Sequence, residues 1–319
     1  MLQTRLCHIF NIQYPIILGG MAFAGDYRLA AAVSEAGGLG VIASGNLAID
    51  ELAEQITAYR KKTDKPLGVN CFIKDTECRE KADLACRMGV SAIFTGIGNP
   101  APVMEFGKKA GIPVIPTVAT VRHALAAIEA GSGIIVAEGQ EGGGHIGRIG
   151  TLPLISQVRK AVGDRVPIIA AGGIGDGSQM IACLVLGATG IMMGTRFLTA
   201  LECPIHDNVK EALIRSGVDD TTVTGQFTGL PMRCLKNQFT SEYQKKEKAV
   251  PSYEMLMFGK GKIREGLMGG DVSNGSLPAG QVIGQLEKIQ SAGEIIRSIV
   301  AEAEDISRKI TENAGFKNW

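Results

Sequence analysis

The sequence predicts an α/β fold, a TIM (β/α)8 barrel with a smaller cap domain inserted after the eighth strand and a C-terminal helix. Short apolar runs recur along residues 1–200, and a helix-like segment follows each run. The runs are apolar throughout rather than alternating, as expected of parallel strands that are buried on both faces. After residue 200 this rhythm stops.

The apolar runs are the strand candidates, and their starts lie roughly 20 to 35 residues apart, the length of one βα unit. Eight consecutive units is the number in a TIM barrel. A doubly wound sheet is the alternative, but it rarely reaches eight units without a different edge element. The expected strands are Pro15–Leu18, Leu39–Ile42, Leu67–Asn70, Ala92–Thr95, Pro113–Ile115, Gly133–Ala137, Pro167–Ala170 and Gly190–Met193.

Capping residues predict where the intervening helices begin. Asp26 precedes a helix over 27–36, and Thr120 precedes one over 121–130. Thr151 similarly precedes 152–162, and Asp176 or Ser178 opens the next helix. Each of these helices carries apolar residues at helical spacing, so one face is expected to pack on the sheet.

The region after the eighth strand holds loops, polar helices and glycine pairs rather than βα units. We therefore expect residues 1–200 to form the barrel and residues 201–279 to form a small cap or substrate domain. Apolar residues at helical spacing then predict a helix over 280–310, which would pack against the barrel and complete it.

Composition excludes several classes of function. The chain has 319 residues, 33 basic and 32 acidic, and a net charge of +1, which argues against nucleic acid as a partner. No apolar run approaches the ~18 residues of a membrane span. The N-terminus lacks a signal-peptide layout, and the 7 cysteines form no Cys-x-x-Cys pair. A cytoplasmic protein without a metal site is expected.

The segment Ala137–Gly147 is the strongest candidate for a functional loop. It follows the sixth strand, and it holds five glycines and His145. Glycine allows close approach of the backbone to a ligand. A histidine held on such a loop is a candidate acid, base or hydrogen-bond donor. In a TIM barrel this loop lies at the C-terminal end of the strands, where active sites occur.

The loops after the seventh and eighth strands, with Gly172-Gly173 and Gly194-Thr195, predict a phosphate site. Backbone N–H groups of Gly172, Gly173, Gly194 and Thr195 would point at one phosphate. The strand ends offer few metal ligands and no Schiff-base lysine, so a phosphorylated cofactor that brings its own chemistry suits the site. Flavin mononucleotide (FMN) is the natural candidate. The G-x-G-x-x-A pattern at 38–43 lies between a helix and a strand, the reverse of the dinucleotide-binding order, and is structural.

At these residues the chain resembles the nitronate monooxygenase (2-nitropropane dioxygenase) superfamily of FMN TIM barrels. Within it, the chain is most similar to the flavin-dependent enoyl-acyl-carrier-protein reductases (FabK type) of fatty acid biosynthesis. The resemblance runs along nearly the whole chain. Its segments lie at residues 14–17, 19–22, 36–40, 65–70, 96–100, 137–139, 143–147, 169–174, 194–197, 236–238, 270–272, 275–276 and 279–281.

The resemblance implies a catalytic role for His145 beside the flavin. In a reductase, hydride passes from NADH or NADPH to FMN and then to the β-carbon of the enoyl thioester, and His145 holds the thioester carbonyl or supplies the α-proton. In the alternative, a nitronate monooxygenase, His145 holds or deprotonates the nitroalkane, and O2 is consumed without a nicotinamide. The implied FMN-binding residues are Gly20, Met21, Ala22, Asn70, Glu138, Gly143, Gly144, Gly172, Gly173, Gly194, Thr195, Ser276 and Gln281.

The resemblance also implies a homodimer and a substrate that is either a small molecule or bound to acyl carrier protein. Residues 230–265 carry eight basic and four acidic residues, which suits an acidic carrier. The chain departs from the reductase pattern at Leu18, where glutamine is usual, and at Phe23, where tryptophan is common. A non-enzymatic ligand-binding barrel is the third hypothesis.

Overall fold

The eight predicted strands form one closed parallel barrel. The structure is a computed structural model, and it describes residues 2–96 and 98–312; residue 97 of the segment 96–100 and the tail from Asn313 lie outside this range. The sheet order is β1-β9-β8-β6-β5-β4-β3-β2. The Leu18 N–H donates to the Leu39 carbonyl (2.9 Å) and the Leu39 N–H to the Ile16 carbonyl (2.9 Å), which joins the two ends of the sheet.

The strand bounds agree closely with the apolar runs. β5 continues beyond the expected range to Val118, because it pairs with β4 on one side and β6 on the other. The strands are β1 (Ile16–Leu18), β2 (Gly40–Ala43), β3 (Leu67–Cys71), β4 (Ala92–Thr95), β5 (Val114–Val118), β6 (Ile135–Glu138), β8 (Ile168–Ala171) and β9 (Gly190–Met193).

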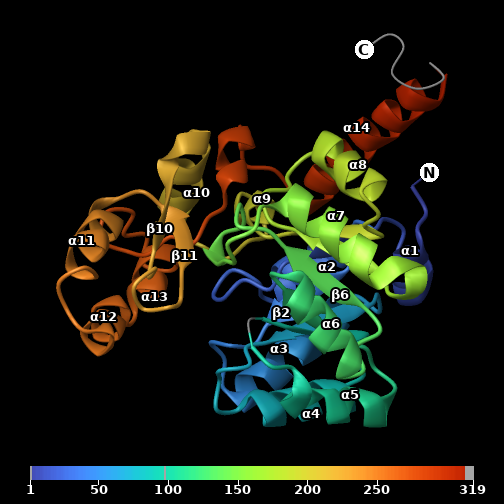
Figure 1. Cartoon of the computed structure of the whole chain (residues 1–319), viewed down its shortest axis with the longest axis horizontal. Coiled ribbons are helices and arrows are strands. Elements are labelled where there is room, and N and C mark those ends of the chain that lie inside the picture. Colours follow the sequence, from blue (N-terminus) through green and yellow to red (C-terminus); the bar gives the residue numbers. More distant parts are fainter. Residues whose placement is uncertain (1, 97, 313–319) are drawn as a thin grey trace.

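Helices alternate with these strands and cover the outside of the barrel (Figure 1). The predicted caps hold at three of them, since Asp26 accepts from the Arg28 and Leu29 N–H groups, Thr120 from that of His123 and Asp176 from that of Gln179. The helices are α1 (Arg5–Phe10), α2 (Tyr27–Glu35), α3 (Ile49–Lys62), α4 (Cys78–Arg87), α5 (Ala101–Ala110), α6 (Val121–Glu129), α7 (Thr151–Val162) with the 3-10 turn η1 (Gly163–Arg165), α8 (Gly177–Val185) and α9 (Thr195–Leu198).

The expectation that Thr151 precedes its helix was wrong, because Thr151 is the first residue of α7. The Glu141 carboxylate accepts the Thr151 N–H (3.0 Å) and hydroxyl (2.9 Å). The cap of α7 thus comes from the glycine-rich loop after β6, and local sequence could not show it. This contact fixes the loop against the helix.

The chain after β9 contributes two strands to a small antiparallel sheet that the sequence analysis missed. β10 (Thr221–Thr224) pairs with β11 (Met232–Leu235), and β11 pairs with β7 (Gly144–His145), so the sheet order is β10-β11-β7. The remaining cap helices project to one side of the barrel (Figure 1). They are α10 (Asp207–Ile214), the 3-10 turn η2 (Val218–Asp220), α11 (Gln238–Lys246), α12 (Ser252–Gly259) and α13 (Lys262–Leu267).

The chain over 280–310 is not the single helix that the sequence predicts. Residues 281–285 form a 3-10 turn, η3 (Gln281–Gln285), and the long helix α14 runs from Ala292 to Glu312. Ser291 starts α14, because its hydroxyl accepts the Glu294 N–H while the Glu294 carboxylate accepts the Ser291 N–H. α14 packs on α8 (Figure 1), where a Cβ at Gly177 would lie 2.5 Å from the Ala303 nitrogen. Among the described residues, no helix has the length and apolar content needed to span a bilayer.

Candidate active site

The floor of the barrel mouth follows from the strand register. Paired residues of neighbouring strands share a face, and the ladder sets Asn70 opposite Phe94, Thr117 opposite Val136 and Glu138 opposite Ala171. Val114 belongs to the other face, which packs on Gly107 of α5. The first set therefore points into the barrel. In their strands only Asn70, Thr117, Glu138 and Met192 are partly exposed.

These four side chains lie at or near the C-terminal ends of their strands. Asn70 and Glu138 are among the predicted site residues, whereas Thr117 and Met192 are not. Alternation along each strand, continued to its last residues, was the signal that could have found them. At β5 this alternation could not reach Thr117, because the expected strand stopped at Ile115.

The loop after β1 brings the predicted residues Gly20 and Met21 onto this floor, beside Gly194 of the loop after β9. A Cβ added to Gly20 would overlap the Asn70 side chain, and one added to Gly194 would lie 3.3 Å from the Met21 Sδ atom. The loop is held by the Gly19 N–H, which donates to the Met193 carbonyl (2.8 Å). Gly20, Met21, Asn70 and Gly194 are thus neighbours. Ala22 lies next to them in the chain, with its side chain exposed.

The loop after β6 meets the loop after β9 through the returning chain at 279–281. A Cβ at Gly143 would lie 2.7 Å from the Gly280 nitrogen. The Gly280 N–H donates to the Thr195 hydroxyl (2.9 Å), and the Gln281 N–H donates to the Glu141 carbonyl (2.9 Å). These bonds place Gly143, Thr195 and Gln281 together at one side of the mouth.

The glycine pair after β8 has a backbone suited to binding an anion. We call the backbone N–H groups of Gly172, Gly173 and Gly194 the glycine cradle. Gly172 and Gly173 have φ of +94° and +69°, a region that favours glycine. Outside helices and strands, none of the backbone hydrogen bonds among the described residues is donated by Gly172, Gly173 or Gly194. These N–H groups can therefore bind an anion. A cavity of about 590 Å³ adjoins the pair, and Gln281 also lines it.

His145 is held in β7 by pairing with Met232 of the cap sheet. Its Nδ1 atom is buried and has no hydrogen-bond partner among the described residues. Burial lowers the pKa of His145 below 6.5, the Lys74 charge lowers it further, and the Pro231 carbonyl opposes the shift. The shift favours the neutral imidazole over the imidazolium. Lys74 is exposed in the loop after β3, and sequence reasoning did not connect its charge with His145.

Most of the chain matches a known family. The family model described as nitronate monooxygenase matches residues 3–85 and 77–302. The chain belongs to the nitronate monooxygenase family. It is an oxidoreductase, and the resemblance that the motifs indicate is confirmed.

Members and structural neighbours of the family match over nearly their full length. FabK from Thermotoga maritima is 37% identical with a TM-score of 0.95, covering 98% of this chain and 100% of that one. A (3aS,4S,5R,7aS)-5-hydroxy-7a-methyl-1-oxo-octahydro-1H-indene-4-carboxyl-CoA dehydrogenase from Mycobacterium tuberculosis is 32% identical, covering 95% and 96%. A probable nitronate monooxygenase from Staphylococcus saprophyticus is 31% identical, covering 97% and 99%.

Ser276 stands apart from the other predicted site residues of this oxidoreductase. It is buried inside the cap, where its hydroxyl lies 3.5 Å from the Cys234 Sγ atom. The structure places it against that thiol and brings it into no described contact with the floor of the mouth. Its role at the cofactor stays a prediction.

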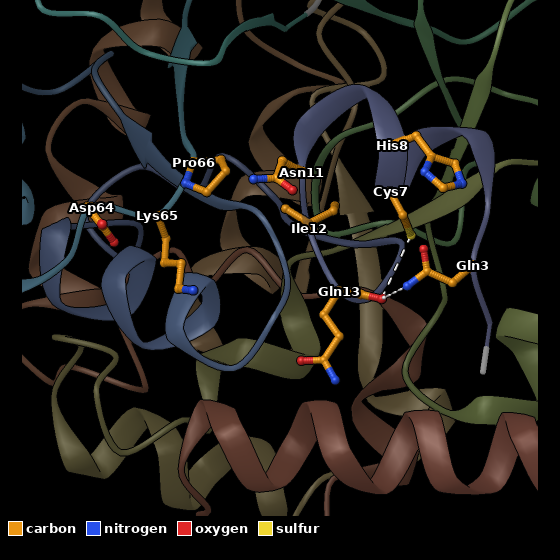
Figure 2. A pocket seen from close by; sticks show the side chains of 9 residues that line it. All are labelled: Gln3, Cys7, His8, Asn11, Ile12, Gln13, Asp64, Lys65 and Pro66. Carbon is orange, nitrogen blue, oxygen red and sulfur yellow. Dashed lines mark hydrogen bonds between the residues drawn. The ribbon is translucent and has the colours of Figure 1, made fainter.

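A second cavity, of about 540 Å³, lies at the opposite end of the barrel (Figure 2). His8, Asn11 and Lys65 line it, beside the residues that precede β1 and β3. Because family active sites of this fold lie at the C-terminal ends of the strands, this cavity takes no part in the candidate site. His123 is exposed on α6, and His206 caps α10. Among the described residues, no cluster of three metal-ligating side chains occurs.

The Glu138 carboxyl makes the stability of the folded protein depend on pH. Burial raises the pKa of its carboxyl from 4.5 to about 7. The folded protein thus binds this proton more tightly than the unfolded chain. The resulting stability is complete below the unfolded pKa of 4.5 and is lost as the pH rises through about 7.

We therefore expect Glu138→Gln to stabilise the cofactor-free protein at pH 8 by roughly 1–3 kcal/mol, and to change its stability little at pH 5. Glutamine keeps the size of the side chain but carries no charge to bury. Urea unfolding at the two pH values measures the difference. Glu129→Gln, at an exposed position, is the control. An equal effect of Glu138→Gln at both pH values would contradict the assignment.

Proposed function

We propose that this oxidoreductase is an FMN-dependent enoyl-acyl-carrier-protein reductase that takes hydride from NADH or NADPH. The observation that carries the choice of reductase is the 37% identity to FabK over nearly all of both chains. The dehydrogenase relative is named for a carboxyl-CoA substrate, which supports a thioester. A homodimer and a cytoplasmic location belong to the same proposal.

The residues around the mouth fit FMN. The backbone N–H groups of Gly172, Gly173 and Gly194 donate no backbone hydrogen bond outside helices and strands among the described residues, so they can bind its phosphate. Cβ atoms at Gly172 and Gly173 would clash with the Gly139 backbone and the Glu141 side chain, so both positions require glycine. Asn70, Glu138 and Met21 would then contact the ring system from the floor of the mouth. When bound, FMN supplies the acceptance and the donation of hydride.

His145 would act on the thioester through Nδ1, the ring nitrogen that has no partner among the described residues. When protonated, Nδ1 can donate to the thioester carbonyl or give a proton to the α-carbon. Burial and the Lys74 charge lower the His145 pKa, which makes the imidazolium a stronger acid. The Lys74 charge also favours the negative charge that develops on the carbonyl oxygen.

The alternative is a nitronate monooxygenase, which the named relative from Staphylococcus saprophyticus favours. In that reaction the unprotonated Nδ1, the form that the lowered pKa favours, would accept a proton from a nitroalkane. In that reaction O2 would be consumed and no nicotinamide would be needed. The two functions therefore differ in which compound reduces the flavin.

Anaerobic stopped-flow absorbance distinguishes them. We expect NADH or NADPH to bleach the flavin band near ~450 nm rapidly, and crotonyl thioester to restore it. If neither nicotinamide bleaches the flavin and a nitronate does, the protein is a monooxygenase. A purified protein that neither carries nor binds flavin would leave only the non-enzymatic ligand-binding hypothesis.

A further inference from the structure

We propose that the exposed side of α12, with the basic residues around it, docks an acidic carrier protein that delivers the enoyl thioester. This inference rests on the proposed function and deepens it, since it assigns the surface that receives the carrier. We call this surface the α12 face. It comprises Tyr253, Leu256, Met257, Lys245, Lys246, Lys248, Lys260 and Arg264.

The apolar part of the α12 face is unusual for an exposed helix. Tyr253, Leu256 and Met257 are 66%, 58% and 65% exposed, while Met255 on the same helix is 1% exposed. One side of α12 thus packs into the cap and the other presents three large apolar side chains to solvent. Clustered apolar side chains of this kind commonly mark an interaction site.

The helix is firmly held beneath these side chains. Phe258 of α12 stacks on Phe239 of α11 with ring centroids 5.4 Å apart, and Tyr243 packs beside both. The Lys246 Nζ atom lies 4.0 Å from the centroid of the Phe258 ring. A docking partner would therefore meet a preformed surface.

The positive charge around the apolar side chains favours an acidic partner. Lys245, Lys246, Lys248, Lys260 and Arg264 are exposed, and none makes an ion pair in the described part of the chain. Lys262 is paired with Glu265 (2.7 Å). Of the four acidic residues over 230–265, Glu247 is buried and Glu265 is paired with Lys262, which leaves Glu242 and Glu254 against these five exposed bases. An acidic protein with an apolar contact complements this surface.

A second copy of this chain fits the face poorly. A two-fold contact would set the same basic residues against one another, because such an interface is self-complementary. The face is also connected to the candidate site. The Gln244 amide of α11 donates to the Thr222 hydroxyl (2.7 Å) of β10, and the same sheet holds His145 in β7.

The test compares one enoyl group on two carriers, acyl carrier protein and free pantetheine, which lacks the protein. We expect Lys245→Glu/Lys248→Glu to lower kcat/KM for the protein-bound substrate about tenfold or more, with no change for the pantetheine thioester. Lys108→Glu/Lys109→Glu is the matched control, because both lysines are exposed in the last turn of α5 on the barrel. An equal loss with both carriers, or the same loss in the control, would overturn the proposal.

Direct binding separates this proposal from the proposed function. Fluorescence anisotropy of labelled acyl carrier protein should show weaker binding to Lys245→Glu/Lys248→Glu and to Leu256→Ser than to the parent and the control. If no enoyl thioester is reduced but these variants still weaken binding, the function fails and the docking surface stands. If the parent instead binds anionic lipid vesicles and not the carrier, and the variants lose that binding, the proposed partner is wrong.

Discussion

His145→Ala is expected to lower kcat by about 10²–10⁴-fold while the protein still purifies with flavin. The side chain is needed for proton transfer or for holding the substrate carbonyl, whereas β7 is held by backbone pairing with Met232. Removing the imidazole should therefore leave the cap sheet and the glycine cradle in place.

The measurement is steady-state turnover together with the flavin content of the purified variant. Reduction of the flavin by the nicotinamide should remain fast, so that the loss falls on the step that involves the second substrate. His123→Ala, on the exposed surface of α6, should behave as the parent does. Unchanged turnover in His145→Ala would remove this residue from the mechanism.

Gly173→Leu is expected to abolish FMN retention. Gly173 has a φ of +69°, and a Cβ there would lie 2.7 Å from the Glu141 Cβ atom, in the loop that also meets Gln281. A leucine side chain would push against Glu141 and displace the backbone N–H groups of this loop from the phosphate. The expected result is a colourless, folded protein.

Backbone strain has to be separated from loss of the cradle. Gly111 has a similar φ of +70° and open space around it, so Gly111→Leu carries the strain without touching the site. Gly194 has a φ of −103°, so Gly194→Val tests the cradle without the strain of a positive φ. The added Cβ atom would meet only Met21 atoms, at 3.3 Å and 3.5 Å. Both cradle variants should lose flavin absorbance and the Gly111 variant should keep it. Full flavin in Gly173→Leu would place the phosphate elsewhere.

Local sequence was sufficient for the barrel strands and for most of the mouth. A buried parallel strand is an apolar run of a few residues between turns, and such runs marked all eight strands. Active sites of this fold lie at the C-terminal ends of the strands, so the predicted strands locate Asn70, Glu138 and the glycine-containing loops after β8 and β9. Their roles at FMN, like the division into a barrel of 1–200 and a cap of 201–279, stay predictions.

What only the tertiary structure decided depends on contacts between distant segments. The strands β10 and β11 exist through pairing with each other and with Gly144–His145, so no local pattern revealed them. The same is true of the Glu141 cap on Thr151 and of Lys74, whose charge reaches His145 from another loop. The Gly280 and Gln281 N–H groups donate hydrogen bonds to Thr195 and Glu141, so they are not part of a helix that continues to residue 310. The helix α14 begins only after Ser291, which caps it. Periodicity and capping report on neighbours in sequence, whereas the acid strength of His145 and the shape of the cradle arise from residues that meet only after folding.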